Sequence, residues 1–369
     1  MMQISPEIQL FIREHSSDDV RVLALQAKKY PDIDMPTVIT QIAGRKVAAE
    51  KIPSWWEIEK IWYPKHLSLE QCSSEITARY KARLLQGDSL TDLTGGFGID
   101  CSFLATGFKS ATYVERQEEL CEIAAHNFPV LNLNHINIKN EDGVTYLQAM
   151  SPVDCLFLDP ARRNEHGGKT VAISDCEPNV AELEELLLQK ANRVMIKLSP
   201  MLDLSLALKE LKQTQEVHIL SVNNECKELL ILLGQTSPAE ISIHCVNLFT
   251  KGTQKEQHFV FTREQEQCSE CTYTDSLETY LYEPNASLLK AGAFRSIAAA
   301  YPVRKLHPNS HLYTSDTFIE NFPGRIFRIV NQCSFNKKEV KENLADLKKA
   351  NVTVRNFPAT VAELRKRIH

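Results

Sequence analysis

Ser89-Leu90-Thr91-Asp92-Leu93-Thr94-Gly95-Gly96-Phe97-Gly98-Ile99-Asp100 is the stretch that decides the fold. A short run ending in an acid is followed by a turn with three glycines in four residues and then by a helical pattern at residues 101–106. Glycine is favoured in such a turn because it adopts unusual backbone angles and lets the main chain approach a ligand closely. The N–H groups of the first helical turn point back at the same place. The stretch therefore predicts the strand, turn and helix on which α/β proteins hold a nucleotide-like ligand.

Strand and helix patterns alternate from this stretch to about residue 234. Apolar runs predict strands at residues 89–92, 111–114, 136–139, 153–158 and 193–197. This alternation predicts a parallel sheet with helices on both faces. Two more strands, at residues 217–222 and 229–233, are separated by six residues. Because a parallel crossover needs about a dozen residues or more, these two strands are expected to form an antiparallel hairpin.

At 369 residues the chain is too long for one ordinary domain, and its length predicts two or three. The patterns along the sequence divide it into four parts. Residues 1–88 are predicted to be helical, and residues 89–236 to form the α/β domain. Residues 237–303 and 304–369 are predicted to be small α+β domains. A helix over residues 68–81 should end just before the glycine turn, and part of its polar side could reach the ligand. A strand is expected at residues 352–357.

The three tryptophans, Trp55, Trp56 and Trp62, lie together in one short linker. Next to basic residues they could stack on nucleobases. They could also pack the amino-terminal helical domain against its neighbour, and packing is the favoured interpretation.

Composition excludes several classes of protein. With 43% hydrophobic and 24% charged residues the chain resembles an ordinary globular protein. No apolar run approaches the roughly 18 residues that span a bilayer, and the first residues do not resemble a signal peptide, so a cytoplasmic protein is expected. Several of the ten cysteines fall in apolar patterns and are interpreted as reduced thiols. The single C-x-x-C, Cys268 to Cys271, lacks a second pair, and no metal is expected.

The net charge of −5 is unevenly distributed. Residues 324–369 contain 11 Lys/Arg and 4 Asp/Glu, a charge of +7, which leaves −12 on the preceding residues. A basic end on an acidic body is typical of a protein that holds a polyanion at one end. A solvated helical surface explains the same charge equally well.

Candidate ligand-binding residues follow the ends of the first three predicted strands. Gly95, Gly96 and Gly98 form the close turn. Glu115 follows the second strand and could accept hydrogen bonds from both ribose hydroxyls of an adenosine-containing ligand, although pairing with its neighbour Arg116 is the alternative. After the third strand, Asp142 could lie near the adenine amino group, or it could simply form a turn. The complete set of candidate cofactor-binding residues is Asp92, Thr94, Gly95, Gly96, Gly98, Glu115, Asp142 and Gly143.

Candidate catalytic residues follow the fourth strand, at the edge where open α/β sheets bind ligands. Asp159 could accept a hydrogen bond from a substrate amine or act as a base. Pro160 would fix the backbone turn, and Arg162 and Arg163 suit contacts with phosphate. A purely structural turn is the alternative. Further substrate candidates, by position or charge, are Lys197, Ser199, Lys337, Lys338 and Arg355.

These residues resemble a known group. The motif Asp92-Leu93-Thr94-Gly95-Gly96-Phe97-Gly98, with Glu115, Asp142 and Asp159-Pro160-Ala161-Arg162, looks like the Rossmann-like (class I) methyltransferases that use S-adenosylmethionine. A parallel sheet finished by a hairpin is their arrangement rather than that of dehydrogenases. The flanking segments resemble a bacterial branch with a ferredoxin-like segment and a carboxyl-terminal THUMP-like domain, and they include residues 69–75, 197–203, 282–284, 289–292 and 355–358. The resemblance covers nearly the whole chain and implies a seven-stranded methyltransferase sheet.

Two departures limit what the resemblance implies about the target. Methyltransferases of base amines usually have an aromatic residue two positions after the first proline of this motif, where Arg162 stands here. Uridine-C5 methyltransferases have a nucleophilic cysteine after the fifth strand, where Leu198-Ser199-Pro200 offers none, so covalent catalysis of that kind is not expected.

The function expected from the resemblance is methylation, with S-adenosylmethionine as cofactor, of a base in structured RNA such as tRNA or rRNA. THUMP domains are associated with structured RNA, which agrees with the +7 tail. The alternatives are a non-catalytic RNA-binding protein on a methyltransferase scaffold and a nicotinamide-dependent dehydrogenase. Against the dehydrogenase, Cys101 replaces the third glycine of the G-x-G-x-x-G pattern that begins at Gly96.

Overall fold

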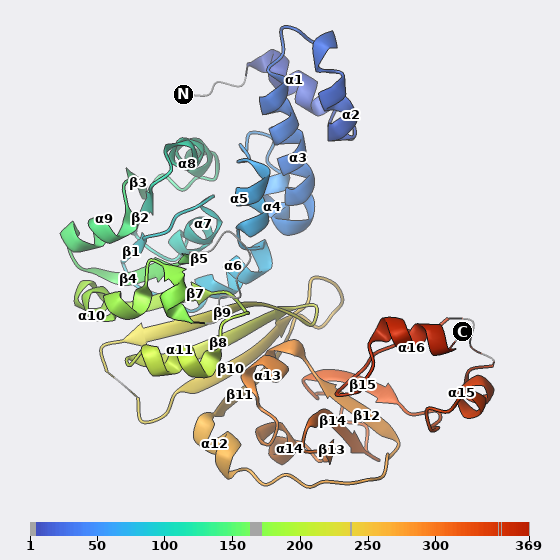
Figure 1. The fold of residues 1–369 in the computed structure, drawn as a ribbon. Helices are drawn as coiled ribbons and strands as arrows, with labels where there is room; N and C mark the ends of the chain where they lie inside the picture. The colour runs from blue at the N-terminus through green and yellow to red at the C-terminus, as the bar shows by residue number, and fades with distance from the viewer. Residues whose placement is uncertain (1–4, 163–171, 237, 346, 348, 369) are drawn as a thin grey trace. The chain divides into compact units, whose positions relative to one another are not determined.

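The computed structural model describes residues 5–162, 172–236, 238–345, 347 and 349–368 (Figure 1). The chain divides into two compact units. The first contains Met1–Glu216 and Glu228–Ala239, and the second contains Val217–Lys227 and Glu240–His369. In the part of the chain that is described, no helix is long and apolar enough to cross a membrane.

The amino-terminal part of the first unit is helical, as predicted. Its helices are α1 (Pro6–Glu14), α2 (Val20–Leu25), η1 (Ala27–Lys29), α3 (Met35–Lys51), α4 (Pro53–Trp56), α5 (His66–Gln71) and α6 (Glu75–Ala82). Side chains of Ser5, Asp19 and Asp34 accept backbone N–H groups at the starts of α1, α2 and α3. These caps satisfy donors that have no partner inside the helix.

The prediction of one helix over residues 68–81 is wrong. The chain leaves helical geometry at Cys72, where φ is −65° and ψ is 160°, and α6 begins three residues later. The break lets the Ser73 hydroxyl donate to the carboxylate of Asp100, 2.7 Å away. A continuous helix would not place Ser73 there, so a long-range polar contact overrides the local helical pattern.

The predicted seven-strand arrangement is present: β8-β9-β7-β4-β1-β2-β3 are consecutive neighbours in a nine-stranded sheet, which β10 and β11 extend beyond β8. The pairs joining β7, β4, β1, β2 and β3 are parallel, whereas β9 is antiparallel to β7. The bounds are β1 (Ser89–Asp92), β2 (Ser110–Glu115), β3 (Ile136–Asn140), β4 (Val153–Leu158), β7 (Ala191–Leu198), β8 (Thr214–Val222) and β9 (Glu225–Gly234). β8 runs from the first unit into the second.

Five helices connect these strands: α7 (Ile99–Ala105), α8 (Glu118–Val130), α9 (Gly143–Ala149), α10 (Val180–Lys190) and α11 (Leu204–Glu210). Leu156 and Phe157 in β4, and Val194 to Ile196 in β7, are at most 1% exposed. Successive side chains of a strand point to opposite faces, so burial along the whole run means that both faces of the central strands are covered. Since both faces of the central strands are covered, a ligand can reach these strands only at their ends. The polar candidate residues lie at the carboxyl ends of the parallel strands.

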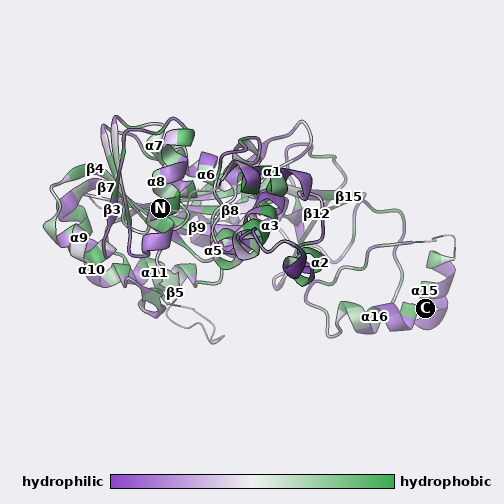
Figure 2. Cartoon of the chain, turned by 90° about the horizontal axis from the view of Figure 1, so that it is seen from above, coloured by the Kyte–Doolittle hydropathy of each residue, from purple (hydrophilic) through white to green (hydrophobic). Residues whose placement is uncertain are grey.

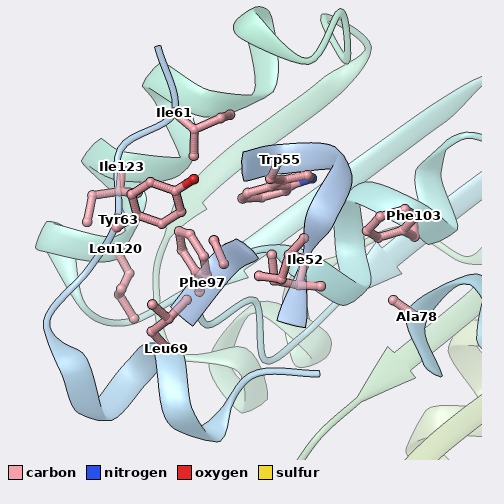
Figure 3. Close-up of a cluster of buried hydrophobic side chains, with 12 residues drawn as sticks. Ile52, Trp55, Ile61, Tyr63, Leu69, Ala78, Phe97, Phe103, Leu120 and Ile123 are labelled. Atoms are coloured by element: carbon pink, nitrogen blue, oxygen red, sulfur yellow. The ribbon is translucent and has the colours of Figure 1, made fainter. Parts of the chain in front are cut away.

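A buried apolar cluster joins the helical part to the sheet within the first unit (Figure 3). Trp55 is 2% exposed, and its ring lies 5.2 Å from that of Phe97 in the glycine turn, edge to face. Trp62 stacks on His126 of α8 at 3.9 Å. Trp56 is 42% exposed. Packing is thus the role of Trp55 and Trp62.

The second unit holds an antiparallel pair, β10 (Ser242–Leu248) with β11 (Glu256–Thr262), and a sheet of order β13-β14-β12-β15. The latter strands are β12 (Tyr280–Pro284), β13 (Arg304–His307), β14 (Ser310–Ser315) and β15 (Gly324–Arg328), and the helices are α12 (Arg263–Cys268), α13 (Ala286–Ala291), α14 (Ser296–Ala300), α15 (Lys337–Leu344) and α16 (Val361–Ile368). Hydrophilic and hydrophobic residues lie side by side along α16 (Figure 2).

The strand predicted at residues 352–357 is not present. These residues have no regular secondary structure, and Asn356 has a φ of +47°, which is incompatible with an extended strand. The Arg355 side chain forms an ion pair with Glu283 of β12. This segment is thus connected to β12 by a side-chain ion pair and not by the backbone hydrogen bonds of a strand.

We expect Trp55→Ala to lower the free energy of unfolding by about 3–5 kcal/mol, because it empties the centre of the buried cluster. Trp56→Ala removes the same side chain from the adjacent, exposed position and should have a much smaller effect. Urea denaturation followed by circular dichroism measures both. Equal losses in the two variants would contradict the role given to the cluster.

Candidate active site

The glycine turn between β1 and α7 requires glycine for specific steric reasons. The Gly95 N–H donates to the carbonyl of Val114 at 2.9 Å, and a Cβ at Gly95 would lie 2.2 Å from the Tyr113 ring. Gly96 and Gly98 have φ values of +54° and +84°, which residues other than glycine rarely adopt. The turn is thus pressed onto β2, and its main chain is available to a ligand.

Glu115 lies against this turn, as its position after β2 predicts. Glu115 is buried, with 8% of its surface exposed. Oε2 accepts the N–H of Gly96 and Oε1 accepts the N–H of Gln117, each at 2.9 Å. The neighbouring Arg116 pairs instead with Glu177 at 3.2 Å. Each carboxylate oxygen can accept a second hydrogen bond, so the group can hold the turn and still receive ligand hydroxyls.

Asp142 and Gly143 stand where β3 leads into α9. Asp142 is exposed, and its Oδ1 caps α9 by accepting the N–H groups of Val144 and Thr145, each at 3.0 Å. A Cβ at Gly143 would lie 2.2 Å from the carbonyl oxygen of Leu93, which follows β1. Gly143 therefore lets the start of α9 approach the chain just before the glycine turn.

Thr94 links the ends of β1 and β4. Its N–H donates to Asp92 Oδ1 at 3.0 Å, and its Oγ1 accepts the N–H of Asp159 at 2.6 Å. Asp92 is 1% exposed, and its Oδ2 has no hydrogen-bond partner among the described residues. Burial raises the pKa of Asp92 to about 8, although the N–H of Thr94 lowers it. Burial therefore favours the neutral form of the Asp92 carboxyl.

Lys197, at the end of β7, contacts Asp159, which follows the end of the neighbouring strand β4. The Lys197 Nζ lies 2.5 Å from Asp159 Oδ2 and 3.2 Å from Asp100 Oδ2. Burial disfavours the charge on Lys197, but the carboxylates of Asp159 and Asp100 outweigh this and raise its pKa well above the usual value. Lys197 is thus a permanent cation that fixes the orientation of the Asp159 carboxylate.

Behind this pair lies a buried charge network that the sequence analysis did not identify. Lys81 of α6 is 0% exposed, and its Nζ contacts Ser73 Oγ at 2.8 Å, Asp100 Oδ1 at 2.9 Å and Glu228 Oε2 at 2.6 Å. The Lys197 Nζ also donates to Ser73 Oγ at 3.1 Å. We call Ser73, Lys81, Asp100, Lys197 and Glu228 the charge network. It connects α6, α7, β7 and β9 directly to Asp159.

The state of Asp100 follows from these contacts. Burial opposes its ionisation, but Lys81 and Lys197 dominate and lower its pKa to about 2. The sequence gives no clear signal for this network, because Lys81 stands between Arg79 and Arg83, and Glu228 directly follows Lys227. Nothing in the sequence says that they pair with each other, since 147 residues separate them.

The remaining predicted site residues lie as follows. Pro160 is buried, and Arg162 pairs through its backbone with Cys176 in a short ladder, β5 (Ala161–Arg162) with β6 (Cys176–Glu177). Arg163 lies outside the described residues. Ser199 accepts the N–H of Met201 at 3.3 Å in the turn after β7. In the second unit, Lys337 and Lys338 are exposed at the start of α15, whereas Arg355 and Arg325 both pair with the buried Glu283.

Three comparisons relate this geometry to known proteins. A model described as a ferredoxin-like domain matches residues 280–323, and one described as THUMP domain-like matches residues 324–369. A crystal structure titled "putative methyltransferase from Porphyromonas gingivalis W83" is 35% identical, with a TM-score of 0.86, over 98% of this chain and 90% of that one. No curated protein matches.

More distant structures resemble only part of the chain. A type I restriction enzyme modification subunit from Vibrio vulnificus YJ016, titled as putative, is 11% identical over 55% of this chain and 56% of that one, with a TM-score of 0.37. A Streptococcus mutans protein solved with SAH, titled "putative methyltransferase", is 13% identical over 43% of this chain and 96% of that one, with a TM-score of 0.32.

The strand order, the antiparallel β9 and the glycine turn with Glu115 define a Rossmann-like fold of the methyltransferase class. The chain belongs to the bacterial methyltransferase family of the Porphyromonas gingivalis protein, in which a ferredoxin-like and a THUMP-like segment follow the sheet domain.

We expect Lys81→Met to lower the free energy of unfolding by about 3–5 kcal/mol, because it leaves the buried Asp100 and Glu228 carboxylates without their shared cation. Lys109→Met makes the same change in an exposed pair, where the Lys109 and Asp88 side chains are 78% and 69% exposed, and should leave stability nearly unchanged. Chemical denaturation measures the difference. A Lys81→Met protein as stable as the Lys109→Met protein would contradict the role of the network.

Proposed function

We propose that this protein is an S-adenosylmethionine-dependent methyltransferase that acts on a base in structured RNA. The observation that carries the proposal is the grouping of the glycine turn, Glu115 and Asp142 at the ends of β1, β2 and β3. Family membership supports methyl transfer, and the THUMP-like segment with its +7 charge supports RNA. We keep the four domains expected from the sequence as a proposal, with boundaries at residues 1–88, 89–236, 237–303 and 304–369.

The residues at this edge fit the cofactor. A Cβ built on Gly96 meets nothing closer than the Thr94 carbonyl oxygen at 3.8 Å, so the turn is open above this residue. Glu115 has lone pairs for ribose hydroxyls, and Asp142 is exposed at the next strand end for the adenine amino group. The bound cofactor would supply an electrophilic methyl group on a sulfonium sulfur.

In the mechanism that follows, this chain mainly aligns the reactants. Asp159 receives a hydrogen bond from the accepting group of the substrate, and Lys197 holds the Asp159 carboxylate at a fixed angle through their 2.5 Å contact. The burial of Pro160 fixes the backbone after Asp159. Alignment of a nucleophile with the departing sulfur accounts for most of the acceleration available to a direct transfer.

RNA would be held by exposed cations of the second unit. Lys337 and Lys338 are free of the buried pairs that engage Arg325 and Arg355, and α16 presents Arg365, Lys366 and Arg367 in its last turn. Lysine and arginine that neutralise phosphates release bound counterions, so RNA affinity should fall as salt rises.

Calorimetry with S-adenosylmethionine tests the cofactor. We expect Gly95→Ala, whose new methyl group collides with the Tyr113 ring, and Glu115→Ala each to weaken binding by at least ~10-fold. Gly107→Ala and Glu118→Ala are the matched controls and should bind as the unchanged protein does, because Gly107 has no neighbour within 3.4 Å of an added Cβ and Glu118 is exposed. No binding by the unchanged protein, or stronger binding of NAD, would contradict the assignment.

Transfer of labelled methyl groups to RNA from cells that lack the gene tests the substrate. We expect Asp159→Asn to lower the transfer rate by about 100-fold while cofactor binding persists, because the accepting group is no longer aligned by a charged partner. Asp154→Asn, at the other end of β4, is the control. Full RNA affinity without labelled nucleosides under any condition would instead favour a non-catalytic RNA-binding protein.

A further inference from the structure

Three histidines lie in a row on one face of the strands in the second unit. His218 belongs to β8, His244 to β10 and His258 to β11, and β10 lies between the other two strands. In the antiparallel pair, His244 is opposite Val260 and His258 is opposite Val246. The two histidines are therefore diagonal neighbours, and residues two apart on a strand share a face.

The rings are close to one another. The His218 and His244 ring centroids are 4.3 Å apart, and those of His244 and His258 are 5.3 Å apart. His244 Nδ1 lies 3.1 Å from His258 Nε2. One ring nitrogen of His218 lies within 4.8 Å of one of His244.

These spacings suit nitrogen ligands of one metal ion. Zinc–imidazole bonds of about 2.0–2.1 Å in a tetrahedral site place two ligand nitrogens roughly 3.3 Å apart. The 3.1 Å contact between His244 and His258 is close to this value, and a ring nitrogen of His218 lies within 4.8 Å of one of His244. The His218 ring is buried, with 3% of the residue exposed. The His258 side chain is exposed, so an ion can reach the three rings from solution on that side.

We propose that His218, His244 and His258 bind a borderline transition-metal ion, with Zn²⁺ as the representative ion. The metal replaces the hydrogen bond between His244 and His258 and leaves one coordination position for water. Glu216 lies two residues before His218 on β8, on the same face of the strand. Its carboxylate pairs with Arg193 at 2.9 Å, so we do not include Glu216 among the ligands. The site does not depend on the methyltransferase proposal.

The sequence predicts no metal because local spacing does not join these residues. They stand 26 and 14 positions apart, unlike the short repeats of cysteine and histidine that indicate zinc motifs. Only the pairing of β8, β10 and β11 brings the three rings together.

Calorimetric titration of the full-length, tag-free, chelator-treated protein with Zn²⁺ at pH 7.5 tests the proposal. We expect one equivalent to bind, and His258→Ala and His244→Ala each to lower the affinity at least ~10-fold. His307→Ala, which removes an exposed histidine of β13, is the matched control and should change nothing. Binding should weaken at pH 5.5, because protonated imidazole cannot bind a metal.

Two outcomes would overturn the site. One is the absence of stoichiometric binding by the unchanged protein. The other is binding that survives His244→Ala and His258→Ala but is lost when Cys268 and Cys271 are both replaced by serine, which would assign the ion to the C-x-x-C thiols. Because His258 is exposed, its variant should fold normally, and circular dichroism verifies this.

Discussion

The first unit depends on one buried cation. Lys81 has no exposed surface, yet its ammonium contacts Asp100, Glu228 and the Ser73 hydroxyl. A charge in such a place is tolerated only when all of its partners are present, since a buried ion without a counter-ion costs several kcal/mol. Helices α6 and α7 and strand β9 therefore adopt their positions together. The break in the helical pattern at Cys72 to Ser74 is a local consequence of this requirement.

The charge network and the glycine turn share one helix. α7 begins at Ile99, directly after Gly98 of the turn, and carries Asp100 in its first turn. On one side the turn is held by Glu115 and by the Tyr113 ring, and on the other side Asp100 is held by Lys81 and Lys197. The cofactor candidates and the catalytic candidate Asp159 are therefore linked through α7, since Lys197 contacts both Asp100 and Asp159.

The sequence predicts those features of the fold that depend on residues close together in the chain. Apolar runs and turn spacing were enough for the parallel strands and the closing hairpin. They were also enough to place Glu115, Asp159 and Lys197 at the carboxyl ends of strands, where their roles are proposed. The sequence could not predict the partners of Lys81, because contacts across 147 residues exist only once the sheet has formed. The histidine row was missed for the same reason. The strand expected at residues 352–357 failed because a side-chain ion pair from Arg355 replaces backbone pairing.

The proposed cofactor site at the ends of β1, β2 and β3 has a geometry that exists before the cofactor binds. A crystal structure of the protein with S-adenosylhomocysteine tests this most directly. We expect ribose hydroxyls on the Glu115 carboxylate, adenine beside Asp142, the sulfur facing Asp159, and an unchanged glycine turn. A ligand bound elsewhere, or one that leaves Glu115 without contact, would contradict the proposed site.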